Sequence, residues 1–158
     1  MATCCITVRY ADLPVQLTVE NDRLVAIDVA EVRTVSAASA GVAARWSVWF
    51  ESAMAPNGAN DSDQLNWQGI PVVYQQILWE LRKSVTVGAT VSYGELAARV
   101  GKPRAARVVG RAMALNPFPI LFPCHRVLLK SGAIGNYSAG GATVKRRLLE
   151  FEKAGLAH

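Results

Sequence analysis

The sequence has few cysteines and histidines, and this scarcity excludes several classes of protein. Its 158 residues include three cysteines and two histidines. An odd number of cysteines, two of them adjacent at Cys4 and Cys5, does not suit a disulfide framework. A structural zinc site needs four ligands, and outside the neighbouring Cys124 and His125 only Cys4, Cys5 and His158 remain. We therefore expect no metal, and we assign Cys4 and Cys5 no role beyond a place in a strand.

Long apolar runs are also missing. No apolar segment approaches membrane-spanning length, although 51% of the residues are hydrophobic. The N-terminus has no basic region followed by an apolar one, which is the pattern of a secretory leader. These features predict an intracellular protein with no membrane partner, located in the cytoplasm, or in the nucleus if its source is eukaryotic.

Acidic residues are scarce in the second half of the chain. Residues 1–66 carry four basic and eight acidic residues, a net charge of −4, whereas residues 67–158 carry thirteen and four, a net charge of +9. So positive a region favours a polyanionic partner such as nucleic acid. It also favours the thiolate form of a cysteine within it.

The pattern of the first half predicts strands followed by a helix. β-rich segments cover 4–10, 15–19 and 24–29, with a turn at Asn21-Asp22, and an Ala-rich helical segment covers 36–52. A polar, turn-rich stretch from Pro56 to Asp63 marks a linker near 55–66. We therefore predict an α/β fold with a small N-terminal domain of antiparallel strands plus a helix (1–66) and a mainly helical C-terminal domain (67–158).

The second half is expected to contain a helix-turn-helix. Apolar spacing predicts a core-facing helix over 72–83, and Ser92 is a plausible cap for a helix over 95–100 that ends at Gly101. A second helix over 104–115 is stopped by Asn116-Pro117. Small residues among arginines would let this second helix approach a nucleic acid backbone closely. These residues are Ala105, Ala106 and Gly110, among Arg104, Arg107 and Arg111.

The segment Pro123-Cys124-His125-Arg126-Val127 carries the strongest chemical signal. A thiolate is a strong nucleophile, and a neighbouring imidazole and guanidinium can hold a thiol deprotonated. The run 116–122 precedes it, and we expect prolines flanking a short apolar strand there to hold the thiol at one angle. Taken alone, a Cys-His pair is also consistent with a small buried cysteine beside a hydrogen-bonded histidine.

Several motifs together resemble one known family, the O6-alkylguanine-DNA alkyltransferases, from about Tyr74 to Glu152. The motifs are Ser92-Tyr93-Gly94, the segment 102–110, Asn116-Pro117, Pro123-Cys124-His125-Arg126-Val127, Gly135-Asn136-Tyr137-Ser138 and Lys145-x-x-Leu148-Leu149-x-x-Glu152. One extra residue near Gly140 shifts the last spacing, so the register of Glu152 depends on the Lys-Leu-Leu-Glu pattern.

The resemblance implies a DNA repair activity. Members of the family bind duplex DNA, flip out O6-alkylguanine and transfer the alkyl group irreversibly to their own cysteine, once per molecule and without a cofactor. The implied N-terminal domain is ribonuclease-H-like, and we expect a monomer. Carried over, Cys124 is the acceptor, His125 its base through a bound water, and Glu152 the residue that orients His125. Tyr93 is implied to protonate the leaving guanine.

Further positions follow from the same resemblance. Arg107 is similar to an intrahelical arginine finger, and Asn116 is implied to fix the bend before the thiol. Tyr93 is also placed at the DNA surface beside the small residues of the second helix. The implied walls of the guanine pocket are Met113, Pro119, Val127, Tyr137 and Ser138.

Three alternatives remain open at this point. The first is a non-catalytic sensor of alkylated DNA, against which the intact Pro123-Cys124-His125-Arg126 segment argues. The second is a cysteine hydrolase that uses Cys124, His125 and Glu152, although no oxyanion hole is evident. The third is a helix-turn-helix regulator, for which the sequence shows no dimerisation element.

Overall fold

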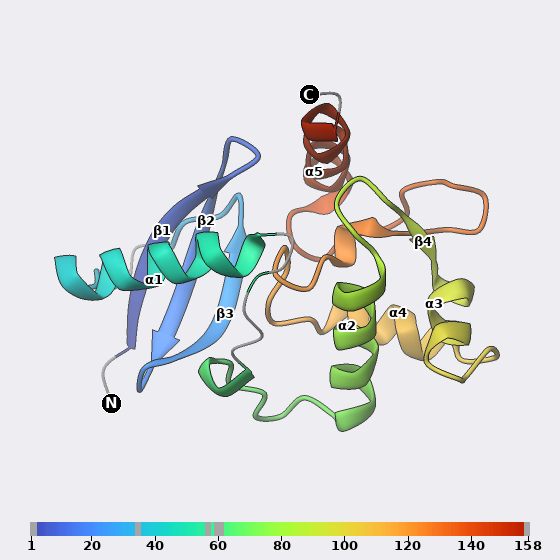
Figure 1. Ribbon diagram of the computed structural model, residues 1–158, viewed down its shortest axis with the longest axis horizontal. Coiled ribbons are helices and arrows are strands. Elements are labelled where there is room, and N and C mark those ends of the chain that lie inside the picture. Colours follow the sequence, from blue (N-terminus) through green and yellow to red (C-terminus); the bar gives the residue numbers. More distant parts are fainter. Residues whose placement is uncertain (1–2, 34–35, 56–57, 59–61, 157–158) are drawn as a thin grey trace. The chain divides into compact units, whose positions relative to one another are not determined.

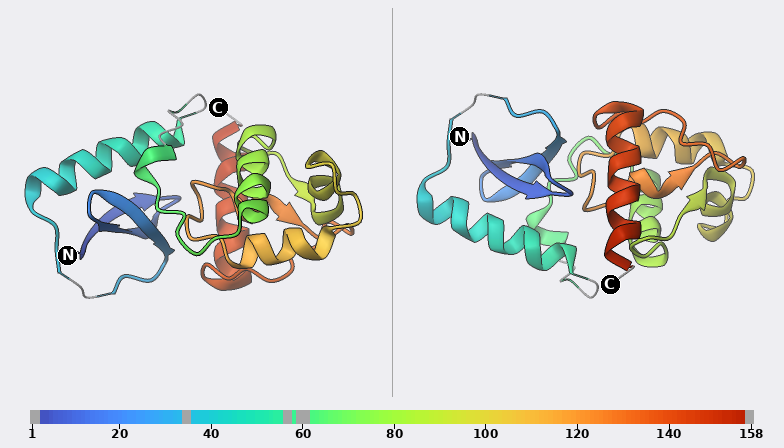
Figure 2. Two further views of the ribbon diagram at one scale, coloured as in Figure 1. Left: turned by 90° about the horizontal axis from the view of Figure 1, so that it is seen from below. Right: turned by 90° about the horizontal axis from the view of Figure 1, so that it is seen from above.

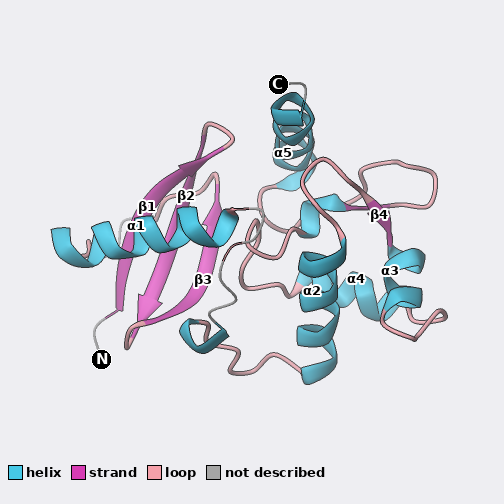
Figure 3. Cartoon of the chain, in the orientation of Figure 1, coloured by secondary structure: helices cyan, strands magenta, loops and turns pink. Residues whose placement is uncertain are grey.

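The computed structural model divides the chain into two compact units, Met1–Gln68 and Gly69–His158 (Figure 1). It describes residues 3–33, 36–55, 58 and 62–156. Most of the predicted linker segment Pro56–Asp63 lies outside the described residues. Figure 3 shows that the long strands belong to the first unit and that the second is mainly helical, so the mixed α/β fold class is confirmed.

The first unit is built on an antiparallel three-stranded sheet. Its strands are β1 (Thr3–Tyr10), β2 (Leu13–Glu20) and β3 (Arg23–Val29), in the order β1-β2-β3. Both connections are two-residue turns with positive φ, at Ala11-Asp12 (52° and 59°) and at Asn21-Asp22 (48° and 62°). Such turns match the twist of paired strands, and the predicted turn at Asn21-Asp22 is confirmed.

One helix supplies the other half of this unit's core. The helix α1 (Ala40–Met54) runs along the sheet in Figure 2, and it buries Trp46 and Phe50. Alternate residues of β2, Val15, Leu17 and Val19, are buried as well. The predicted helix over 36–52 therefore exists, but it begins and ends a few residues later. A short 3₁₀ helix, η1 (Ser62–Gln64), precedes the buried Leu65.

The second unit arranges four helices around a small parallel strand pair. Its elements are α2 (Val72–Ser84), β4 (Val91–Ser92), α3 (Tyr93–Arg99), α4 (Ala106–Ala114), the 3₁₀ helix η2 (Cys124–Arg126), β5 (Val127–Leu128) and α5 (Gly141–Leu156). Val91 pairs with Val127, and Ser92 pairs with Leu128. The start of α3 is thereby held beside the strand that directly follows the Cys-His-Arg segment.

The helix-turn-helix, formed by α3 and α4, has well-defined ends. Ser92 Oγ accepts from Glu95 N at 3.1 Å while Glu95 Oε2 accepts from Ser92 N at 2.8 Å, which is a complete capping box. After the C-terminal end of α3, Gly101 adopts φ 74°. Its N–H donates to Ala98 O, and Lys102 N–H donates to Ala97 O. The predicted cap and the predicted stop at Gly101 are both confirmed.

Two local predictions were wrong. The second helix begins at Ala106, two residues later than predicted, so Arg104 precedes it and Ala105 is its N-cap. No strand forms over 120–122, because Phe122 N–H donates back to Phe118 O at 2.9 Å and closes a tight turn. Ile120 lies inside this turn with φ 73°.

Among the described residues, no helix combines the length and apolar character needed to cross a membrane.

Candidate active site

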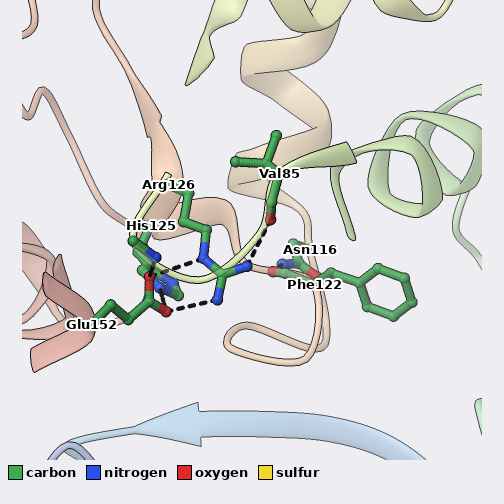
Figure 4. Close-up of polar contacts among 7 residues, drawn as sticks. Val85, Asn116, Phe122, His125, Arg126 and Glu152 are labelled. Carbon is green, nitrogen blue, oxygen red and sulfur yellow. Dashed lines mark hydrogen bonds and ion pairs between the residues drawn. The ribbon is translucent and has the colours of Figure 1, made fainter. Parts of the chain in front are cut away.

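Cys124 is the first residue of the 3₁₀ helix η2 and is only 4% exposed. Its backbone N–H donates to Phe122 O at 2.7 Å. Phe122 O also accepts from Asn116 Nδ2 at 2.9 Å, and Asn116 Oδ1 accepts from Phe118 N–H at 3.0 Å. The Asn116 side chain thus ties the end of the helix-turn-helix to the segment that carries the thiol, as Figure 4 shows for its bond to Phe122.

Burial has a larger effect on the pKa of the Cys124 thiol than the positive charges around it. Burial raises the pKa of Cys124, and the nearby side chains of Asn116, Tyr137 and Lys145 lower it only in part. The positive charge of this half acts in the expected direction, since Lys145 lowers the pKa of Cys124, but burial outweighs it. The resting group is a thiol, so its reaction as a nucleophile needs a base.

His125 is fully buried and has one ring nitrogen engaged. Its Nε2 lies 2.7 Å from Glu152 Oε1, and its Nδ1 has no hydrogen-bond partner among the described residues. Because the carboxylate accepts a hydrogen bond from Nε2–H, the neutral ring keeps its lone pair on Nδ1. Burial lowers the pKa of His125, although Glu152 opposes this, so the ring is neutral at rest.

Glu152, on α5, is shared between His125 and Arg126 (Figure 4). Arg126 donates from Nε to Oε2 at 2.9 Å and from Nη2 to Oε1 at 2.8 Å, and its Nη1 donates to Val85 O at 2.7 Å. Burial alone would raise the pKa of Glu152, but the hydrogen bonds from His125 and Arg126, together with the charge of Arg126, lower it to about 2. The carboxylate is therefore ionised, and Arg126 compensates its charge inside the unit.

Lys145 is a buried cation to which the sequence analysis gave no role. It is 1% exposed, and its Nζ donates to Val127 O at 2.7 Å and lies 5.9 Å from the centroid of the Tyr137 ring. Its charge lowers the pKa of Cys124. Its helical spacing with Leu148 and Glu152 was the available signal, because it placed the lysine on the inward face of α5.

Tyr93 opens α3 and lies against α4. A Cβ added at Gly110 would meet the Tyr93 ring at 4.0 Å, so the glycine leaves the ring ordinary contact distance to the helix. Burial and the proximity of Cys124 raise the pKa of Tyr93, which keeps the phenol protonated. Tyr93 thus lies close enough to Cys124, 31 positions away in the sequence, for a charge on the sulfur to raise the pKa of the phenol.

The residues predicted to face DNA have different degrees of exposure. Arg107 on α4 and Arg104 in the preceding turn are exposed, whereas Ala105, Ala106 and Gly110 are partly buried. Arg111 is also exposed on α4. The exposed side of this helix accordingly carries the basic residues Arg107 and Arg111.

The predicted pocket walls are mostly inside the unit. Met113, Pro119, Val127 and Tyr137 are buried, whereas Ser138 is exposed. The Tyr137 hydroxyl is buried and forms no hydrogen bond of normal geometry with the described residues. Burial, then the proximity of Cys124, raises the pKa of Tyr137. Over the described ranges, no group of three or more His, Cys, Asp or Glu side chains is placed to hold a metal ion.

These features define a class of two-unit α/β protein that combines a helix-turn-helix with a buried cysteine beside a His–Glu pair. Residues 73–154 match the family model described as "6-O-methylguanine DNA methyltransferase, DNA binding domain". Since this span covers more than half of the sequence, the chain belongs to the 6-O-methylguanine DNA methyltransferase family.

Named relatives agree with this membership. The chain is 49% identical over 111 residues to the methylated-DNA–protein-cysteine methyltransferase of Rattus norvegicus, an alignment that covers 67% of this chain and 53% of the relative. It is 58% identical over 78 residues to the Homo sapiens protein of the same name, covering 49% and 37% of the two chains. The chain thus spans about half the length, or less, of these relatives.

Solved structures show the same fold over nearly the whole chain. The Mycobacterium tuberculosis OGT in complex with DNA has a TM-score of 0.73 and 32% identity, over 95% of this chain and 92% of that one. The Mycobacterium tuberculosis O6-methylguanine methyltransferase has a TM-score of 0.73 and 29% identity, over 97% and 94%.

Proposed function

We propose that this protein repairs DNA by direct reversal of alkylation damage. It binds duplex DNA, flips out O6-alkylguanine and transfers the alkyl group irreversibly to Cys124, once per molecule. The observation that carries the proposal is the buried thiol of Cys124 beside a neutral histidine whose Nε2 is held by Glu152 and whose Nδ1 is unpartnered among the described residues. Family membership and the DNA complex of the Mycobacterium tuberculosis OGT support the choice of substrate.

The chemistry requires removal of the thiol proton at the moment of attack. His125 Nδ1 takes this proton, through a water molecule, and Glu152 stabilises the imidazolium that forms. The Cys124 sulfur then forms a bond to the alkyl carbon while the bond from that carbon to O6 breaks. Because Arg126 also pairs with the carboxylate, Glu152 does not hold His125 protonated before the reaction.

The leaving group determines the role of Tyr93. The electron pair of the broken bond stays on guanine, which becomes neutral when it takes a proton from the Tyr93 hydroxyl. Proton exchange between the imidazolium and the phenolate restores both side chains. The product is a thioether, which has no ready hydrolytic exit, so the protein is consumed. This is an S-methyltransferase activity on its own cysteine.

Arg107 is proposed to act on the duplex and not in the chemistry. Its exposed side chain on α4 fills the space that the extruded base leaves, while the partly buried Ala105, Ala106 and Gly110 allow the helix to approach the backbone. We propose that the protein acts as a monomer, inside the cell, where duplex DNA is found.

Intact-protein mass spectrometry tests the proposal. The protein is mixed with an equal amount of duplex DNA that contains one O6-methylguanine, with unmodified duplex as the control. We expect a gain of one methylene unit, mapped to the Cys124 peptide and saturating at one per molecule. Cys4 and Cys5 serve as internal controls, and Cys124→Ala should show no gain while it still binds the lesion. If the wild type binds the lesion selectively but transfers no methyl group, the protein is a sensor. If it instead turns over a substrate of cysteine hydrolases, it is a hydrolase.

A further inference from the structure

Arg82, on α2, contacts the segment that leads to Cys124. Its Nη1 donates to Leu121 O at 3.1 Å, and its guanidinium lies 5.6 Å from the centroid of the Phe122 ring and 6.0 Å from that of Trp79. The rings of Trp79 and Phe122 pack edge to face, with centroids 4.9 Å apart. Burial lowers the pKa of Arg82, which reflects a partly desolvated cation held against aromatic rings.

The segment that Arg82 holds is strained. Ile120 adopts φ 73°, in the left-handed region, and its side chain is buried. A β-branched residue is rarely found there, and such a conformation persists only where the surrounding structure enforces it. The carbonyl that accepts from Arg82 belongs to the next residue, Leu121. The contact is therefore placed where it opposes relaxation of the strained turn.

Two side chains hold successive carbonyls of this turn. Arg82 binds Leu121 O, and Asn116 binds Phe122 O. Phe122 O is also the acceptor for Cys124 N–H at 2.7 Å. The two anchors come from different parts of the unit, α2 and the segment just after α4. The second held carbonyl also accepts directly from the amide of Cys124.

We propose that Arg82 is a positioning residue for Cys124. It holds the turn at Ile120 in its strained form, and it thereby sets the position of the sulfur relative to His125 and to the incoming alkyl carbon. The expected effect of Arg82 on alkyl transfer rests on the proposed function, whereas its expected effect on the Cys124 backbone does not. A displacement of about 1 Å at a reacting atom costs on the order of 100-fold in rate.

The test compares three variants. Arg82→Met keeps much of the apolar stem and removes the guanidinium. Arg82→Lys keeps the positive charge. It has no planar guanidinium, however, that could lie against the rings while it donates to Leu121 O. Arg99→Met is the matched control, since Arg99 Nη1 also donates to a backbone carbonyl of the same unit, Ser84 O at 3.3 Å, in a different segment from the turn at Ile120.

Two readouts are measured well below each variant's thermal midpoint. The first is the single-turnover rate of methyl transfer at saturating O6-methylguanine duplex, together with the affinity for unmodified duplex. The second is hydrogen exchange of the Phe122 and Cys124 amides in the free protein. For Arg82→Met we expect transfer roughly 10- to 100-fold slower with affinity within about twofold of wild type, and faster exchange at both amides. Arg82→Lys should be intermediate, and Arg99→Met should match wild type in both readouts.

Each outcome decides a separate question. If wild type transfers no methyl group, the proposed function fails, and the exchange of the Cys124 amide alone decides the positioning role. If wild type transfers but Arg82→Met is equally fast and equally protected, the positioning role is overturned. A loss of rate in Arg82→Met that Arg99→Met shares also overturns it, because the effect is then a general one on the unit.

Discussion

Replacing Glu152 by Gln should affect stability and alkyl transfer through two separable contacts. The carboxylate is 2% exposed and pairs with both His125 Nε2 and Arg126. Gln retains the shape of the side chain but removes its charge. Arg126, itself 5% exposed, is then left as a buried cation with no counter-ion from Glu152.

Two routes give a similar magnitude for the loss of stability. Each pKa unit corresponds to about 1.4 kcal/mol, so lowering the pKa of Glu152 from 4.5 to about 2 contributes about 3 kcal/mol to the free energy of unfolding at neutral pH. This contribution is fully present above pH 4.5 and is lost as the pH falls towards about 2, because the folded-state pKa is the lower one. Removing one partner of a buried ion pair costs about 3–5 kcal/mol.

A second variant separates the structural loss from the catalytic one. In Glu152→Gln with Arg126→Met neither charge is left unpaired, so we expect most of the lost unfolding free energy to return. His125 still lacks its carboxylate partner, so methyl transfer should stay about 100-fold or more below wild type in both variants. Glu150→Gln, at an exposed position of α5, is the control and should change unfolding free energy by less than about 0.5 kcal/mol.

The assay combines urea unfolding with single-turnover transfer from an O6-methylguanine duplex. If Glu152→Gln alone costs less than about 1 kcal/mol, the carboxylate is not part of a buried ion pair. If the double variant transfers at the wild-type rate, Glu152 has no part in activating the thiol. The first result would refute the predicted role of Glu152 in stability, and the second would refute its predicted role in alkyl transfer.

Four further outcomes are expected. Arg107→Ala should slow repair of duplex DNA far more than reaction with free O6-benzylguanine, since only the duplex requires base extrusion, and equal losses would contradict this role. Transfer should stay constant as the pH falls from about 8 through 6.5, because burial lowers the pKa of His125, and a rate that halves at pH 6.5 would argue against a buried neutral base. The same lowered pKa should reduce folding stability below pH 6.5, since the unfolded chain binds the proton more readily. Ser92→Ala should cost about 1 kcal/mol and lower the thermal midpoint of the 158-residue protein by roughly 2–4 °C, as measured by calorimetry, through loss of the capping box.

Local features of the fold were predictable from the sequence where short-range chemistry decides them. The two-residue turn at Asn21-Asp22 and the cap at Ser92 follow from which side chains tolerate positive φ or satisfy free helix N–H groups. The run at 120–122 was mispredicted as a strand. Its apolar composition of Ile, Leu and Phe favours extended backbone. The hydrogen bond from Phe122 N–H to Phe118 O and the anchors from Asn116 and Arg82 instead close it into a turn.

The candidate site shows the same division. The motifs around Cys124 and Glu152 carried the resemblance to the family, and the contact between His125 and Glu152 is present in the structure. Their catalytic roles stay predictions until transfer is measured. Arg82 was not identified from the sequence, because an arginine on a core-facing helix gives no sign of which carbonyl it will meet across 39 positions.

The sequence by itself determined the family and the helix-turn-helix, and it singled out Cys124 as the predicted nucleophile, because these depend on the order and spacing of residue types along the chain. The tertiary structure alone decided the protonation state of the thiol and the partners of the buried charges. Net charge favoured a thiolate, but burial raises the pKa of Cys124, since removing water penalises an ion more than distant cations stabilise it. In the same way Arg126 was expected to act on the neighbouring thiol, and folding instead brought it to Glu152, 26 positions away, where it compensates the carboxylate.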